Sequence, residues 1–569
     1  MFLLHWQNTE DSIGKAIILK KIDKVKEKEA TSPLSKQVTK SASEAQPNCS
    51  PACQTVFVTT AGMRENDWAK PQQAICHQFA QRASNWTICP KCYGRGKKNL
   101  RLRKKSRIRF QIAMKEFEKT KSEGKASVRP KVTQFLCDNC SGSGLIPATC
   151  RPIADSEKYP HVAIIGAGIG GVALAVACLH RGIPFTLYER DSSFDARAQG
   201  YGLTLQQASN AIKGLGLFSL KDGGNSTRHV VHTTEGKEIT EWGMRTHSNI
   251  KESPKRRNVH IPRQALRLAL LEQLGGHDAV QWGHRLVCFK QCEDKSVELS
   301  FQVNGEMKSD KADLVVGADG IRSVVRSWLI GEDMTPLRYL GHVVILGICS
   351  LEALKGVESS LLDSATVFQT VNGHERIYMM PYSLDSVMWQ LSFPMSEEEA
   401  KALSAQGAQA LKEEACRRTQ WHKPIPQILS ATLPAQISGY PVYDRELLKS
   451  ELLEKAGAVT LIGDAAHPMS PFKGQGANQA LLDALLLARN ISIACTPFSK
   501  WRETGVREVV LSEFEEEMLA RSASKVKDSA EAVELLHSKG VLREGYEPKG
   551  RPFCNKKKTP DAGFEPATP

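Results

Sequence analysis

The sequence lacks any uninterrupted apolar stretch of the roughly 18–20 residues that a membrane-spanning helix needs. Its first residues, MFLLHWQNTEDSIGK, have too short an apolar run, and acidic residues too early, for a secretory signal. The cysteines form no disulfide framework, because seven of the 15 stand singly after residue 160. These absences argue against a membrane-spanning or secreted protein, and we expect a cytoplasmic one.

Charge is unevenly distributed along the 569 residues. The net charge is +14, and all of this excess lies in the first 160 residues, because the rest of the chain is slightly negative. Residues 1–70 are polar and show little periodicity, which is typical of a disordered segment. The basic run RLRKKSRIRF (101–110) follows, so a protein or nucleic-acid partner would bind the N-terminal part.

A short cysteine pattern occurs twice within residues 75–150. CPKCYGRG (89–96) and CDNCSGSG (137–144) both read CxxCxGxG, and four thiolates complete a tetrahedral zinc site. The pattern resembles part of the cysteine-rich domain of the J-protein co-chaperones, although only two of that family's four repeats occur here. One zinc ion is therefore implied, held by Cys89, Cys92, Cys137 and Cys140. The alternatives are redox dithiols or free thiols.

From His161 onward, the sequence alternates between strand and helix patterns. In HVAIIGAGIGG, an apolar strand runs into Gly166, Gly168 and Gly171, the spacing of a dinucleotide-binding turn. A second predicted strand ends at Glu189, about twenty residues further on, where an acid suits a free ribose hydroxyl. The turn therefore predicts FAD or NAD, and disfavours NADP at this site.

Two later segments favour FAD. ADLVVGADGIRSVVR (312–326) and VTLIGDAAHPMSPFKGQGAN (459–478) each break from an apolar strand into a glycine- and aspartate-containing turn. Asp464 follows directly on the second strand, where its carboxylate suits a polyol hydroxyl. FAD has such a polyol, the ribityl chain, whereas NAD has none. The GQGAN run (474–478) opens a helix whose free N–H groups suit an electron-rich ring.

These three motifs, in this order, resemble the group A FAD-dependent monooxygenases over about residues 160–500. The resemblance implies that the glycines of the first turn bind the FAD pyrophosphate, that Glu189 binds the adenosine ribose and that Asp464 binds the ribityl chain. It further implies that the flavin site includes Arg190, Arg197, Arg263, Asp319, Gly476, Ala477 and Asn478. It identifies no catalytic side chain, because the flavin performs the chemistry.

The expected architecture is α/β, with an FAD-binding Rossmann-like domain, an inserted mixed β-sheet substrate domain and the small zinc module. The expected boundaries of the flavoenzyme are 160–335 and 445–498 for the FAD-binding domain, 336–444 for the substrate domain, and 499–545 for C-terminal helices. In the substrate domain, Phe368, Met379, Met380, Trp389 and Leu391 either line an apolar cavity or form core.

The function implied by the resemblance is hydroxylation of a small aromatic or polycyclic compound through a flavin C4a-hydroperoxide formed with molecular oxygen. No second GxGxxG turn of matching context occurs, so NAD(P)H is expected to bind transiently. One alternative is a zinc-bearing binding protein for nucleic acid or protein, with a non-catalytic or sensor flavin fold. Another is a flavin oxidase or epoxidase on the same fold.

Overall fold

The computed structural model describes residues 85–99, 108, 112, 134–197, 200–220, 223–243, 259–496 and 498–543. These residues belong to one unit of the chain, 71–569. The segment at 1–70, predicted to be disordered, lies outside the described residues. So does nearly all of the basic stretch between the two cysteine repeats.

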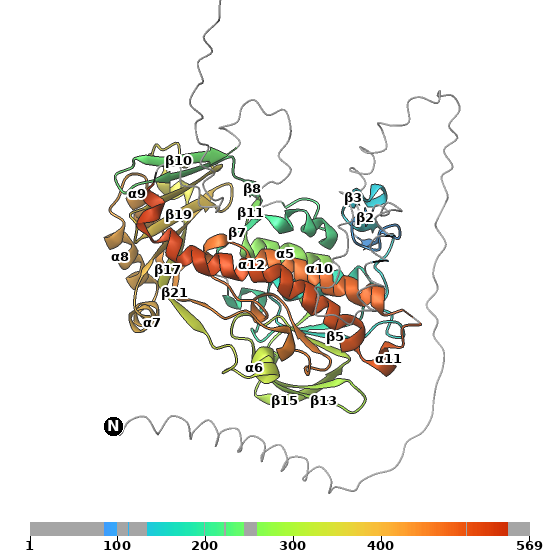
Figure 1. The fold of residues 1–569 in the computed structure, drawn as a ribbon. Coiled ribbons are helices and arrows are strands. Elements are labelled where there is room, and N and C mark those ends of the chain that lie inside the picture. Colours follow the sequence, from blue (N-terminus) through green and yellow to red (C-terminus); the bar gives the residue numbers. More distant parts are fainter. Residues whose placement is uncertain are drawn as a thin grey trace, which may run out of the picture. The chain divides into compact units, whose positions relative to one another are not determined.

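A five-stranded parallel sheet forms the centre of the flavin-binding part (Figure 1). Its strands, in spatial order, are β12 (Val280–Gln281), β6 (Phe185–Tyr188), β5 (Val162–Ile165), β16 (Leu314–Gly317) and β22 (Val459–Leu461). The four residues of β5 and of β16 are all buried, as expected of central parallel strands covered on both faces. The order places the ends of β5, β6, β16 and β22 along one edge of the sheet.

Three helices pack around this sheet: α4 (Ile169–Leu179), α5 (Arg263–Leu274) and α10 (Gly476–Ala494). Small residues let α4 and α10 approach closely, because a Cβ added at Gly170 would lie 3.4 Å from the Cβ of Ala480. Two three-stranded sheets complete this part: β7 (Gly202–Leu205), β11 (Val259–Pro262) and β8 (Gly224–Asn225), and the meander β13 (Arg285–Gln291), β14 (Val297–Val303) and β15 (Glu306–Ala312). Helix α6 (Val324–Ile330) follows β16.

A seven-stranded mixed sheet forms the second part, as predicted. Its spatial order is β10 (Glu238–Gly243), β9 (Arg228–His232), β18 (Thr366–Val371), β19 (Arg376–Pro381), β20 (Ser386–Pro394), β17 (Arg338–Ser350) and β21 (Ile437–Asp444). Only the β18–β9 pair is parallel. Strands β9 and β10 lie outside the range 336–444 expected for this sheet. Helices α7 (Glu397–Ala405), α8 (Ala408–Arg418) and α9 (Ile425–Ala431) share an apolar core with its strands.

The C-terminal helices connect the two parts. After α11 (Trp501–Thr504), the long helix α12 (Ser512–Leu536) runs beside α10 towards the seven-stranded sheet (Figure 1). There, the ring of His537 contacts the Ser392 hydroxyl of β20 at 2.8 Å. Among the described helices, none is both long and apolar enough to cross a membrane.

The two cysteine repeats fold into a small unit, here called the Cys unit and defined as residues 85–99 and 134–150. Two short antiparallel pairs hold it together. They are β1 (Trp86–Ile88) with β4 (Leu145–Pro147), and β2 (Lys97–Asn99) with β3 (Gln134–Leu136). Each pair joins one repeat to the other, so the unit forms only when both repeats come together.

Candidate functional site

The glycine-rich turn joins β5 to α4. Gly166 has a φ of +105°, and a Cβ added there would lie 2.6 Å from the Ala318 carbonyl oxygen. A Cβ at Gly171 would lie 1.9 Å from the Gly166 carbonyl oxygen, so packing requires glycine at both positions. Gly168 precedes α4, and a Cβ there would have no atom within 4 Å. The space before the free N–H groups of α4 is therefore open, as a pyrophosphate requires.

Glu189 lies directly after β6, against this turn. Its carboxylate accepts hydrogen bonds from the backbone N–H groups of Ala167, at 2.8 Å, and Asp191, at 3.2 Å. Buried Arg267 of α5 supports the turn, because its Nε donates to the Ala167 carbonyl oxygen at 2.7 Å. Sequence reasoning missed Arg267. The available signal was an arginine one turn after Arg263, on the same helix as buried leucines.

The structure places the three predicted arginines on different elements. Arg263 is the first residue of α5, and its guanidinium carbon lies 6.0 Å from the centre of the Tyr201 ring. Arg190 is exposed beside Glu189, and Arg197 ends a short 3-10 helix, Phe194–Arg197. Arg263 is close enough to Asp464 to lower the pKa of that carboxyl group.

Asp319 follows β16 and anchors the start of α6. Its carboxylate accepts from the Ser323 hydroxyl at 2.5 Å and from the backbone N–H of Val324 at 2.7 Å. Buried Arg326 then connects α6 to the next motif, because its Nη1 donates to the carbonyl oxygens of Ala465 and Ala466 at 2.8 and 2.9 Å. The second and third motifs are therefore held together by a buried arginine.

Asp464 follows β22 and faces a cavity. A Cβ added at Gly476, the first residue of α10, would lie 3.3 Å from the Asp464 Oδ1 atom, so the third motif forms one continuous wall. Asp464 reaches solvent through the cavity but is surrounded by protein. This enclosure raises the pKa of Asp464, whereas the nearby His467 and Arg263 lower it and only partly offset the rise.

The start of α10 is fixed by the side chain of Asn478. Its Oδ1 accepts from the backbone N–H groups of Gln206, at 2.8 Å, and Ala208, at 3.1 Å. Its Nδ2 donates to the carbonyl oxygens of Thr204 and Gly474. All of these bonds are internal, so the Asn478 side chain positions the loop. Gly476 and Ala477 also line the cavity, as do the preceding residues of the loop from Lys473 onward.

One cavity of about 860 Å³ extends from this wall to the seven-stranded sheet. Its sheet side is lined by Gln369, Tyr378, Met380, Met388 and Gln390. Of the five residues for which the sequence left two interpretations open, only Met380 lines the cavity. The other four belong to the core on the opposite face of the sheet: Phe368, Met379, Trp389 and Leu391. Burial lowers the pKa of Lys473, which lines the cavity beside α10.

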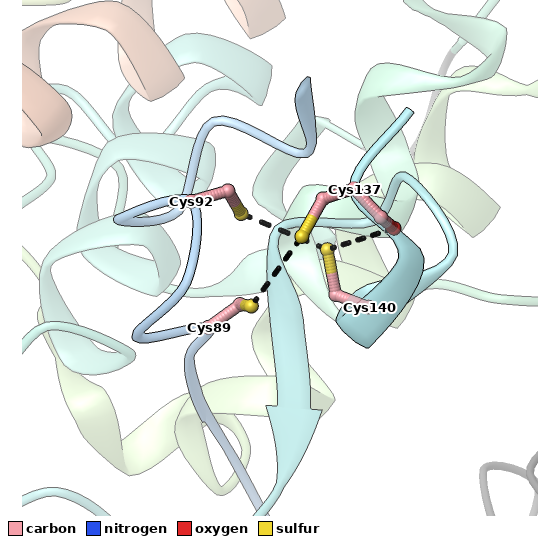
Figure 2. A group of neighbouring side chains, drawn as sticks. All are labelled: Cys89, Cys92, Cys137 and Cys140. Carbon is pink, nitrogen blue, oxygen red and sulfur yellow. Dashed lines mark hydrogen bonds between the residues drawn. The ribbon is translucent and has the colours of Figure 1, made fainter. Parts of the chain in front are cut away.

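The four predicted cysteine ligands come together in the Cys unit (Figure 2). All four are buried, and their Sγ atoms lie within 4.8 Å of one another. Cys89 and Cys137 are 3.9 Å apart, and Cys92 and Cys140 are 3.7 Å apart. The backbone N–H groups of Gly96 and Gly144 each point at the sulfur of the second cysteine in their repeat, at 3.3 Å.

Known proteins match the flavin-binding part of this chain. A curated relative is the aurachin C monooxygenase/isomerase of Stigmatella aurantiaca, 29% identical over 58% of this chain and 80% of the relative. Another is an FAD-dependent urate hydroxylase of Klebsiella pneumoniae, 26% identical over 61% of this chain and 87% of the relative. The solved structure of Klebsiella pneumoniae HpxO with FAD and uric acid shares the fold, with a TM-score of 0.53 at 23% identity, covering 67% of this chain and 89% of that one.

A family model described as the FAD binding domain matches residues 159–496, more than half of the chain. The matched range contains all three motifs and both large sheets. The chain therefore belongs to the FAD binding domain family and is an FAD-dependent oxidoreductase.

Proposed function

We propose that this protein is an NAD(P)H-dependent FAD monooxygenase that hydroxylates a small aromatic or polycyclic compound with molecular oxygen. The observation that carries the proposal is a continuous cavity that joins Asp464 and the start of α10 to one face of the seven-stranded sheet. Such a cavity allows a flavin and a substrate to meet. The names of two relatives, a urate hydroxylase and a 3-amino-4-hydroxybenzoate 2-monooxygenase, support a small aromatic substrate.

The chain's own residues would bind and orient the cofactor. The open N-terminus of α4 suits a pyrophosphate, Glu189 suits the adenosine ribose, and Asp464 suits the ribityl hydroxyls. When bound, FAD supplies electron storage and the activation of oxygen, and the protein supplies position and a shielded cavity.

The sheet face of the cavity suits an aromatic substrate that carries polar groups. Tyr378, Met380 and Met388 offer apolar and sulfur contacts, while Gln369 and Gln390 offer amide donors and acceptors. Because Gln369 already accepts a hydrogen bond from Arg376 Nε, at 2.9 Å, its amide is held in one orientation. A ring that stacks on the apolar side chains would thus be oriented by its substituents.

The first experiment is the visible spectrum of the purified protein under anaerobic conditions, before and after addition of NADH or NADPH. We expect a flavin spectrum that bleaches with one of the two nucleotides and recovers when air is admitted. Candidate aromatic compounds are then screened for faster nucleotide consumption, and the product is analysed after reaction under ¹⁸O₂. One ¹⁸O atom in a hydroxylated product supports a hydroxylase. A flavin that neither nucleotide reduces would contradict the proposal, and hydrogen peroxide without labelled product would indicate an oxidase.

For the Cys unit, we propose one structural zinc ion. A tetrahedron with zinc–sulfur bonds of about 2.3 Å has edges of about 3.8 Å. The sulfur separations of 3.7 and 3.9 Å in two pairs fit this geometry. The N–H groups of Gly96 and Gly144 would stabilise metal-bound thiolates through their contacts with sulfur. Elemental analysis of the full chain should give one zinc per chain. A Cys92→Ser, Cys140→Ser variant should give none, and zinc-free wild-type protein would contradict the site.

A further inference from the structure

The Cys unit packs against the flavin-binding part through both repeats. The ring of Trp86 lies 4.4 Å, centre to centre, from that of Phe218. A Cβ added at Gly94, in the first repeat, would lie 2.8 Å from the Nη2 atom of Arg181. In the second repeat, the Ser143 carbonyl oxygen lies 3.3 Å from the position of a Cβ added at Gly214, which belongs to the flavin-binding part. The unit therefore has a fixed docking face on the flavin-binding part.

The docking face covers the C-terminal ends of the helices whose N-terminal ends form the candidate flavin site. Arg181 follows α4, and its Nη1 donates to the Ala177 carbonyl oxygen in the last turn of that helix, at 2.8 Å. Arg151 follows the Cys unit, and its Nη1 donates to the carbonyl oxygen of Leu274, the last residue of α5, at 3.0 Å. Cations are favourable at such ends, because the helix dipole is negative there.

Two arginines at this face have an Nε atom with no hydrogen-bond partner among the described residues. They are Arg181, which is buried, and Arg489 of α10, which is partly buried and is also attracted by Glu517. Burial, together with the nearby Arg489, lowers the pKa of Arg181 to about 10, so Arg181 remains charged at neutral pH. The cysteine that interacts electrostatically with both guanidinium groups is Cys92.

A zinc ion held by four thiolates has a net charge of −2, so it would attract these two cations. We propose that the zinc-loaded Cys unit acts as an anionic clamp: its negative charge attracts Arg181 and Arg489 and so holds α4 and α10 in position. Metal binding would thereby strengthen FAD binding at the opposite ends of these helices. The inference rests on the zinc site proposed above. Helix α4 has 11 residues and spans about 16 Å, and it packs directly on α10, so the proposed coupling would act along both helices.

The test measures FAD affinity with and without zinc in the full chain. A mercurial releases the zinc from the thiolates, and excess thiol with EDTA then restores free cysteines without metal. The dissociation constant of FAD is measured by the quenching of flavin fluorescence. We expect it to rise at least about fivefold when zinc is removed, the lower end of ordinary coupling between two sites.

Two variants test whether the arginines carry the coupling. In an Arg181→Gln, Arg489→Gln protein, zinc removal should change the FAD dissociation constant less than about twofold. Arg489→Gln alone, at a less buried position, should reduce the coupling if the double variant does not fold. Arg181→Lys keeps the charge and should keep the coupling. The matched control is Arg417→Gln, which removes an exposed arginine of α8.

The outcomes separate this inference from the proposals on which it depends. Wild-type protein without zinc would overturn both the zinc site and the clamp. Zinc at one per chain, with FAD affinity unchanged by its removal, would overturn the clamp and leave the zinc site standing. Equal loss of FAD affinity in wild-type and arginine variants would also overturn the clamp. None of these readouts requires turnover, so the identity of the substrate does not affect them.

Discussion

The carboxylate of Asp464 lies where β22 ends, 3.3 Å from the position of a Cβ added at Gly476, and it is open to the cavity. We predict that Asp464→Ala purifies without stoichiometric flavin. A hydrogen bond to a charged group contributes about 1.5–3 kcal/mol, so FAD affinity should fall about tenfold or more. Flavin content after gel filtration and titration with free FAD would measure this loss.

The matched control is Asp385→Ala, which removes an exposed aspartate from the turn before β20. Its flavin content should equal that of the wild type. Asp464→Asn keeps a polar side chain of the same shape and should lose less affinity than the alanine variant. Stoichiometric flavin retained by Asp464→Ala would contradict the assignment of this residue to the cofactor.

At the scale of residues, the sequence predicts the positions where a motif fixes the residue type. Gly166 and Gly171 are needed for close approach, and Asp464 follows a predicted strand, so each could be found by pattern. Arg267 belongs to none of the three motifs and was missed. It donates to a backbone carbonyl group of a segment distant in sequence, and a single sequence shows its charge but not its burial.

At the scale of elements, substitutions at two glycines of the turn between β5 and α4 should have different effects, one on folding and the other on FAD binding. We predict that Gly171→Ala is strongly destabilised, because its Cβ would lie 1.9 Å from the Gly166 carbonyl oxygen and would push α4 away from the sheet. Gly168→Ala should fold normally, because its Cβ meets no protein atom within 4 Å. The same Cβ would occupy the space proposed for the pyrophosphate, so FAD affinity should fall.

Urea unfolding and flavin titration of both variants distinguish these effects. The expected result is a lowered unfolding midpoint for Gly171→Ala, and a normal midpoint with weakened FAD binding for Gly168→Ala. If Gly168→Ala binds FAD like the wild type, the pyrophosphate does not approach the backbone at this position, and the proposed role of the turn is wrong.

The strands of the seven-stranded sheet were predictable as strands, but the function of each face was not. Met379 is core and its neighbours Tyr378 and Met380 line the cavity; Trp389 is core and Met388 and Gln390 line the cavity. Successive side chains of a strand point to opposite faces, so the alternation itself was expected. Both faces are largely apolar here, and only the position of α7–α9 decides which face is core.

At the scale of the whole molecule, assembly depends on contacts between distant segments. Strands β9 and β10 join a sheet whose other members begin at Arg338, and His537, after α12, contacts Ser392 of the same sheet. Local patterns in one sequence contain no information on such pairings. This lack of information explains why the boundaries expected for the substrate domain omitted two of its strands, whereas the parallel sheet that carries the motifs could be predicted.

Three buried histidines make the stability of the whole molecule sensitive to acid. Burial lowers the pKa of His180 to about 3, of His232 to about 4 and of His537 to about 3. A histidine in the unfolded state has a pKa of about 6.5. At a pH between the folded-state and unfolded-state pKa values, the unfolded state therefore binds more protons than the folded state. We predict that the free energy of unfolding falls as the pH is lowered from about 7 to 5, by up to about 1.4 kcal/mol per pH unit for each fully contributing histidine.

His537 allows this prediction to be tested at one site. Its Nδ1 faces the Val533 carbonyl oxygen at 2.6 Å and must donate, so its Nε2 accepts from the Ser392 hydroxyl and the neutral ring satisfies both. Urea unfolding of His537→Gln should show lower stability at pH 7, but a shallower fall between pH 7 and 5 than the wild type. His374→Gln, which changes an exposed histidine, should keep the wild-type slope. Equal slopes in wild-type and His537→Gln proteins would mean that this ring does not contribute, and that acid sensitivity arises elsewhere in the molecule.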